Sequence, residues 1–199
     1  VGKTWRRGEV LPWGIDTARF APRPRPADER PSRVLYVGRL RPEKGADLLI
    51  RAVGRVNAGL ENGGLSLTIA GDPRAHPQYA AYLRNTALSC GLSSKMNFAG
   101  FVPPDEMPDL YRAHDLFACP SASVEPLSLP VLEAMASGLG VVSTATGGNA
   151  EFLEDEANAL VVPTENEDRL AEALRRLVRD PGLAASLGSR ARRPVEESC

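Results

Sequence analysis

Residues 33–45 read RVLYVGRLRPEKG, and this stretch decides the fold. Its first part, residues 33–38, is a short run of β-branched, aromatic and aliphatic side chains that ends in glycine, which is typical of a buried parallel strand. Residues 46–58 follow with apolar side chains at spacings of three and four, and Gly59 stands where such a helix would end. A strand, a glycine-containing loop and a helix in this order form the repeating unit of an α/β protein.

The same alternation continues along the chain. The expected further strands cover residues 65–70, 96–99, 116–119, 140–144 and 159–162, and the expected further helices cover residues 78–89, 105–113, 129–137 and 167–179. This pattern predicts a Rossmann-like α/β fold, a parallel sheet with helices on both faces. Because ligands bind at the carboxyl ends of parallel strands, we expect the functional site in the loops that follow the strands.

The composition is that of an ordinary globular protein, with 43% hydrophobic and 25% charged residues and a net charge of −1 in 199 residues. This balance gives no indication of a nucleic-acid partner or an anionic membrane surface, since both require a basic face. No run approaches the roughly 18 to 20 apolar residues that span a bilayer, so we expect no transmembrane segment. The three cysteines and two histidines form no cluster at metal-ligand spacing, so we expect no metal site and a reduced, cytoplasmic setting.

The loop after the first strand carries two cations, Arg39 and Lys44, with Gly38 and Gly45 beside them. The planar fork of an arginine and the point charge of a lysine suit a diphosphate. Together they can neutralise a leaving group whose negative charge grows as its bond to a sugar breaks. An arginine and a lysine at this spacing are more often part of a solvated loop, so the interpretation depends on the neighbouring loops.

A second candidate is residues 120–137, PSASVEPLSLPVLEAMAS, in which Glu125 lies in a loop and Glu133 on the expected helix. The spacing of the two glutamates is uninformative by itself in a chain rich in glutamate. The helix start is more informative, because unpaired backbone N–H groups and the positive end of the helix dipole favour phosphate. Glu125 can then accept hydrogen bonds from sugar hydroxyls, and Glu133 from the two ribose hydroxyls.

A third candidate is the glycine pair Gly147 and Gly148 in residues 146–151, TGGNAE, after the strand at 140–144. Two glycines permit a positive φ and a close approach of the backbone to a ligand. They are equally typical of an ordinary tight turn, and the sequence leaves both interpretations open.

Five blocks of sequence, taken in order, resemble the C-terminal domain of the retaining family 4 (group 1) glycosyltransferases, which have the GT-B fold. The blocks are VLPWGIDTARFAP (10–22), VLYVGRLRPEKGADLLIRA (34–52), LTIAG (67–71), FAGFVPPDEMPDLYRAHDLFACPS (98–121) and EPLSLPVLEAMASGLGVVSTATGGNAEFL (125–153). They cover most of residues 10–180, and the ordered set is far more specific than any one motif.

The resemblance implies a role for each matching residue in binding a nucleoside-diphosphate sugar, the donor substrate. Arg39 and Lys44, with Gly38 beside them, would bind the diphosphate, Glu125 the sugar hydroxyls and Glu133 the ribose. Of these, Arg39, Lys44 and Glu125 would take part in catalysis. Transfer would retain the anomeric configuration without a metal or other cofactor.

The resemblance also implies contacts made by the backbone. The turn at Phe101 and Val102 would hold the base, and the backbone at Leu127, Ser128 and Leu129 would bind sugar and phosphate. Ser128 stands where the family commonly has glycine, which is a mild departure because its N–H remains.

By the same resemblance, residues 1–30 are an inter-domain linker and the end of an N-terminal domain, residues 31–182 the Rossmann-like nucleotide-sugar-binding domain, and residues 183–199 a truncated helical tail. We expect the acceptor domain, through which the enzyme could also contact a membrane peripherally, to be missing from this chain. The chain alone would then bind the donor without turnover.

A non-catalytic nucleotide-binding or scaffold module of the same fold stays open as an alternative. A dinucleotide-dependent oxidoreductase does not, because no GxGxxG follows the first strand and no acidic residue ends the second.

Overall fold

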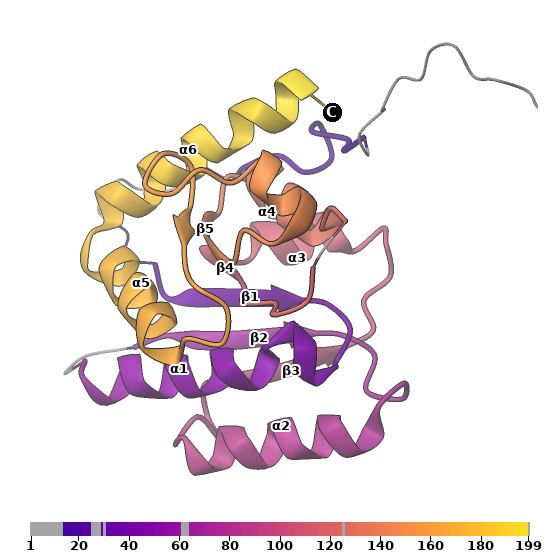
Figure 1. Cartoon of the computed structure of the whole chain (residues 1–199), viewed down its shortest axis with the longest axis vertical. Helices are drawn as coiled ribbons and strands as arrows, with labels where there is room; N and C mark the ends of the chain where they lie inside the picture. The colour runs from indigo at the N-terminus through magenta and orange to yellow at the C-terminus, as the bar shows by residue number, and fades with distance from the viewer. Residues whose placement is uncertain (1–13, 25–28, 30, 61–63, 125, 199) are drawn as a thin grey trace, which may run out of the picture.

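The computed structural model describes residues 14–24, 29, 31–60, 64–124 and 126–198, and it confirms the expected α/β fold. Its strands form one parallel sheet in the order β3-β2-β1-β4-β5-β6 (Figure 1). The strands are β1 (Arg33–Val37), β2 (Ser66–Ala70), β3 (Met96–Gly100), β4 (Leu116–Cys119), β5 (Gly140–Ser143) and β6 (Leu160–Val161).

Each strand is followed by a helix or a short helical turn. The helices are α1 (Ala46–Ala58), α2 (Pro77–Ser89), α3 (Met107–Arg112), α4 (Leu129–Ala136), α5 (Glu167–Arg179) and α6 (Pro181–Ser198), and the 3₁₀ turns are η1 (Pro42–Lys44) and η2 (Gly147–Glu151). The helix expected over 105–113 begins later, because a turn closed by the Glu106 N–H and the Pro103 carbonyl precedes it.

Hydrophobic clusters cover both faces of the sheet, and β1 contributes to both. Val34 and Tyr36 pack on one face, with α1, α2 and α5. Leu35 points to the other face, where α3 and α4 lie. Because neighbouring residues of a strand point to opposite faces, a central strand buried on both sides is apolar throughout. This is why the run at residues 33–38 was a reliable sign of the fold.

The expected C-terminal tail is one continuous helix that packs into the same core. Leu187 and Ala191 of α6 are fully buried. At Gly188 the helix backbone touches the turn after α4, since a Cβ atom there would lie 2.3 Å from the carbonyl oxygen of Gly138. Only glycine permits this contact between α6 and α4.

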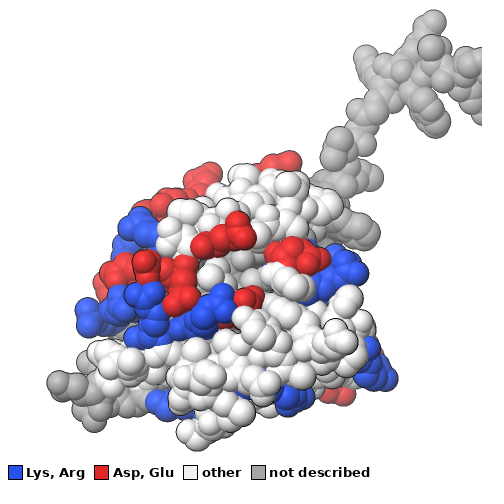
Figure 2. Space-filling model, turned by 60° about the horizontal axis from the view of Figure 1, so that its bottom comes forward, with Lys and Arg blue, Asp and Glu red and all other residues white. Residues whose placement is uncertain are grey.

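The surface carries many ion pairs between neighbouring elements. Arg51 of α1 contacts Glu167 of α5 at 3.0 Å, and Arg55 pairs with Asp168 next to it. On the face shown in Figure 2, Lys and Arg side chains lie beside Asp and Glu side chains. Among the described residues, no helix is both long and apolar enough to cross a membrane.

The Gly188 contact leads to a prediction about stability. Gly188→Ala should destabilise the chain by about 1 to 3 kcal/mol, the usual cost of overpacking a closed contact. Gly182→Ala in the first turn of the same helix is the matched control, because its Cβ would meet only Asp180 Oδ1, at 3.3 Å. The control should be neutral or stabilising, since alanine is the better helix former by about 1 kcal/mol. Urea denaturation measures both, and equal effects of the two variants would contradict the prediction.

Candidate functional site

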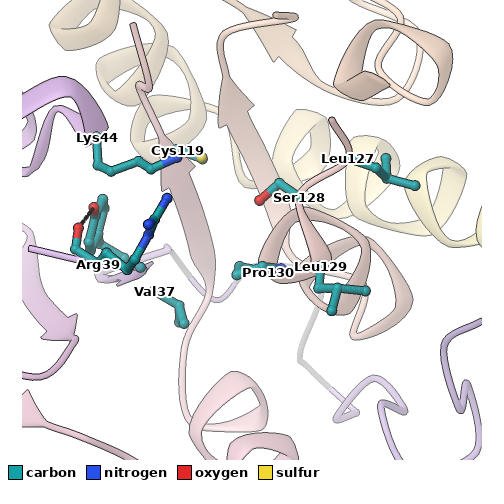
Figure 3. Close-up of a pocket in the computed structure, with 10 residues that line it drawn as sticks. Val37, Arg39, Lys44, Cys119, Leu127, Ser128, Leu129 and Pro130 are labelled. Carbon is teal, nitrogen blue, oxygen red and sulfur yellow. Dashed lines mark hydrogen bonds between the residues drawn. The ribbon is translucent and has the colours of Figure 1, made fainter. Parts of the chain in front are cut away.

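A pocket of about 300 Å³ lies at the carboxyl ends of β1 and β4, where the order of the sheet reverses. The chain runs from β1 toward one edge of the sheet and from β4 toward the other, so the loops after these two strands diverge and leave a crevice between them. The pocket is lined by Tyr36, Val37, Gly38, Arg39 and Lys44 on the β1 side and by Cys119, Leu127, Ser128, Leu129 and Pro130 on the β4 side (Figure 3).

The loop after β1 is held against the loop after β4 by backbone contact. Gly45 has a φ of 72°, and a Cβ atom there would lie 2.4 Å from the Pro120 carbonyl oxygen. The Ala122 N–H donates to the Glu43 carbonyl at 2.9 Å. Position 45 therefore requires glycine for two reasons: the positive φ and the close approach to the Pro120 carbonyl.

The two cations lie on the same side of this pocket. The Lys44 Nζ donates to Ser123 Oγ at 3.2 Å, which ties it to the loop after β4. The Tyr36 hydroxyl donates to the Arg39 carbonyl at 3.2 Å and fixes the backbone there (dashed line, Figure 3). The Arg39 side chain is exposed, and its guanidinium makes no hydrogen bond or ion pair with any described residue. Lys44 is thus held in place, and all the donors of Arg39 are available to a ligand.

The start of α4 faces these cations across the pocket. We expected its N–H groups to be unpaired, and for Ser128 this was wrong, since its N–H donates to Asn149 Oδ1 at 2.9 Å. Pro130 has no N–H, whereas those of Leu127 and Leu129 donate no hydrogen bond within the described part of the chain. The backbone N–H groups of Leu129, at the positive end of the helix, and of Leu127, just before it, are therefore available to an anion.

The glycine pair after β5 makes a close approach to protein backbone. A Cβ atom at Gly148 would lie 1.7 Å from the Pro126 carbonyl oxygen. Asn149, next along, is completely buried, and its Nδ2 has no partner among the described residues. The third candidate loop thus holds the second one in place through Gly148 and Asn149.

Glu133 lies one helical turn beyond Pro130 and is therefore on the same side of α4. Its Oε2 accepts a hydrogen bond from the hydroxyl of Tyr111 in α3, at 2.8 Å. Burial raises the pKa of Glu133 above its ordinary value, and the Tyr111 hydrogen bond opposes that rise. A carboxylate kept in a poorly solvated position is typical of a functional group.

Not every residue expected at the site lies in the pocket. Phe101 and Val102 begin the loop after β3 and are absent from the lining, and the Phe101 side chain is 62% exposed. Glu125 lies outside the described residues, so its role stays a prediction. Within the described ranges, no three His, Cys, Asp or Glu residues are grouped so as to hold a metal ion.

Sequence reasoning gave no role to Tyr36, Tyr111 or Asn149. Tyr36 is a polar side chain in an apolar strand and Asn149 one in a glycine-rich turn, and this was the available signal, whereas Tyr111 stands among charged residues and gave none. It was weak because the partner of each hydroxyl or amide depends on which loops meet in space.

The sequence pattern of the family described as glycosyl transferases group 1 matches residues 18–194. The chain belongs to this family. It is 33% identical to the GDP-mannose-dependent alpha-(1-6)-phosphatidylinositol monomannoside mannosyltransferase of Mycobacterium tuberculosis, over 92% of this chain and 50% of that protein. It is also 33% identical to the D-inositol 3-phosphate glycosyltransferase of Rhodococcus jostii, over 96% of this chain and 44% of that protein. The chain thus spans about half the length of these relatives.

Solved structures of group 1 and related glycosyltransferases share the fold. The C-terminal domain of the group 1 protein LpcC from Francisella tularensis superposes with a TM-score of 0.80 and 26% identity, over 92% of this chain and 97% of that one. HepE from Anabaena in complex with UDP-glucose gives a TM-score of 0.83 and 25% identity, over 96% of this chain and 53% of that one. The chain thus matches nearly the whole of that isolated domain and about half of HepE.

The partly buried carboxyl of Glu133 gives a prediction about pH. The pKa of Glu133 is raised above 4.5, so its contribution to stability is present below that pH and is lost as pH rises through the folded-state value. Glu133→Gln, which keeps the size and an acceptor for Tyr111, should therefore stabilise the ligand-free chain at pH 7. The gain should be about 1.4 kcal/mol for each unit of pKa shift, and it should vanish below pH 4.5.

Thermal or urea unfolding across this pH range measures the gain. The control is Glu154→Gln, at an exposed position in the loop before β6, which should show no such gain. Loss of stability in Glu133→Gln at pH 7 would contradict the prediction.

Proposed function

We propose that this chain is the donor-binding domain of a retaining glycosyltransferase that transfers a sugar from a nucleoside-diphosphate sugar to an acceptor. The observation that carries the proposal is the pocket between β1 and β4. It has Arg39 and Lys44 on one wall and the start of α4 on the other (Figure 3). Cations facing a helix N-terminus form a site for a compact anion with several oxygens, such as a diphosphate.

In this proposal the diphosphate lies between the two walls. The guanidinium of Arg39 and the ammonium of Lys44 bind its oxygens from the β1 side, and the N–H of Leu129 donates from the α4 side. Negative charge grows on the diphosphate as the glycosidic bond breaks, so these groups stabilise the transition state more than the ground state.

The other parts of the donor are assigned by position along the chain. Glu133, one turn into α4, accepts hydrogen bonds from the ribose, and Glu125, before the helix, from the sugar. The backbone at Phe101 and Val102, after β3, holds the base. The leaving phosphate helps to deprotonate the acceptor on the face that it leaves, which gives retention of configuration without a metal.

The same proposal assigns the donor and the acceptor to different domains. The chain matches about half of each relative and nearly all of one isolated C-terminal domain. Residues 31–182 with helix α6 bind the donor, and a further domain supplies the acceptor. The donor site alone lies open to water, which neither positions an acceptor nor excludes hydrolysis, so this 199-residue chain binds donor without transfer. The cytoplasmic setting stays a prediction.

The test is the pattern of affinities across ligands, measured by calorimetry with UDP, GDP, their sugar conjugates and the free nucleosides. Arg39→Ala and Lys44→Ala should each weaken diphosphates and sugar conjugates alike, by about 1.5 to 3 kcal/mol for a charged hydrogen bond, and leave nucleosides unaffected. Glu125→Gln should weaken only the sugar conjugates.

Arg74→Ala is the matched control, because Arg74 is an exposed arginine whose charge is paired with Asp72. It should change none of these affinities. A folded chain that binds neither UDP nor GDP at millimolar concentration would contradict the donor site and favour the scaffold alternative. A loss of diphosphate affinity in Glu125→Gln equal to that for the sugar conjugate would contradict the assignment of that residue.

A further inference from the structure

We propose that Tyr111 is a positioning residue of the nucleotide site, whose hydroxyl holds one oxygen of Glu133 so that the other is directed to the ribose. The inference rests on the proposed function, since it takes Glu133 as the ribose-binding residue. It adds to that function a side chain from α3 that touches no part of the ligand.

The geometry joins α3 to the beginning of α4. The Tyr111 hydroxyl lies 2.8 Å from Glu133 Oε2 and 3.2 Å from the Pro130 carbonyl oxygen. A hydroxyl has one proton to donate, and the shorter contact is the one to the carboxylate, where the bond is charge-assisted. Tyr111 thus fixes the carboxylate relative to the helix that forms one wall of the pocket.

Packing alone does not account for a tyrosine at this position. The ring of Tyr111 contacts Phe20 edge-on, with ring centroids 5.7 Å apart, and Phe117 at 6.0 Å. Phenylalanine would make the same ring contacts. The hydroxyl is completely buried, and burying it costs free energy unless it is bonded. Its presence is therefore explained by what it binds.

The second oxygen of Glu133 is left for a ligand. Oε1 accepts no hydrogen bond from any described residue. Oε1 is also absent from the set of buried polar atoms that lack a partner in the described residues. An atom without a partner that is not buried is accessible to solvent. Pro130, one turn earlier on the same side of α4, lines the pocket, and Glu133 follows just beyond that lining along the helix.

Holding Oε2 in place has an energetic consequence for binding. A free glutamate side chain has several rotatable bonds, and ordering it on binding costs free energy. Tyr111 imposes that order before the ligand arrives. Burial and the charge of Glu133 raise the pKa of Tyr111 well above its ordinary value, so its hydroxyl stays a donor throughout the physiological range.

The experiment measures dissociation constants of UDP, GDP and inorganic pyrophosphate for the 199-residue chain and its Tyr111→Phe variant. We expect Tyr111→Phe to weaken the nucleotide that binds by about two- to tenfold, the value of one hydrogen bond, and to leave pyrophosphate unchanged. In a Glu133→Ala background, Tyr111→Phe should cause no further loss, because no carboxylate remains to be positioned.

Tyr79→Phe is the matched control. The Tyr79 hydroxyl also lies 2.8 Å from a carboxylate, that of Asp47, but neither residue lines the pocket between β1 and β4. It should leave nucleotide affinity unchanged. If Tyr111→Phe does not fold, Glu133→Asp is a second variant: the shorter acid loses the Tyr111 contact and also moves the oxygen assigned to the ribose, so it should weaken the nucleotide at least as much and leave pyrophosphate unchanged.

Three outcomes would overturn the inference while the donor site stands. The first is a nucleotide affinity of Tyr111→Phe within twofold of that of the unmodified chain. The second is an equal fall in pyrophosphate affinity. The third is the same loss of nucleotide affinity when Tyr111→Phe is added to Glu133→Ala. Absence of any nucleotide binding to the unmodified chain would instead overturn the proposed function, and this inference with it.

Discussion

The site depends on direct backbone contact between loops that are distant in the sequence. Gly45 approaches Pro120, and Gly148 approaches Pro126, so closely that no side chain fits between them. These contacts hold the cation loop opposite the start of α4, on the two sides of the pocket at the β1–β4 switch point. Without them, Arg39 and Lys44 would lie on a solvated loop, as such residues usually do.

The sequence was sufficient for the fold because the fold depends on local patterns. Apolar runs such as residues 33–38 end in glycine at the carboxyl edge of the sheet, and the helices between them have the expected periodicity. The sequence also placed Arg39, Lys44 and Leu127 to Leu129 in loops that share one edge, and the pocket brings them together. The positions of Phe101, Val102 and Glu133 outside its lining could not be read from the sequence, because they depend on helix orientation and loop path.

What the sequence could not give was the partner of each polar group. The N–H of Ser128 was expected to be free, and it is taken by Asn149, a residue 21 positions later. Glu133 was expected to accept the two ribose hydroxyls, and the structure adds a partner from a different helix, Tyr111, at one of its oxygens. Buried polar groups must find partners, but the choice is made by tertiary packing rather than by neighbours in the chain. Both hydrogen bonds fix groups of α4 or of its N-cap residue, and the start of this helix forms one wall of the pocket.

Whether the β1–β4 pocket holds the nucleotide diphosphate can be measured by titrating the ¹⁵N-labelled chain with UDP or GDP and following its backbone amide resonances. We expect the amides of Gly38, Lys44 and Leu129 to shift together and to reach saturation. Pyrophosphate should reproduce these shifts. Shifts confined to the cavity of about 490 Å³ on the other side of the cation loop, lined by Asp47, Arg51 and Glu165, would contradict this expectation.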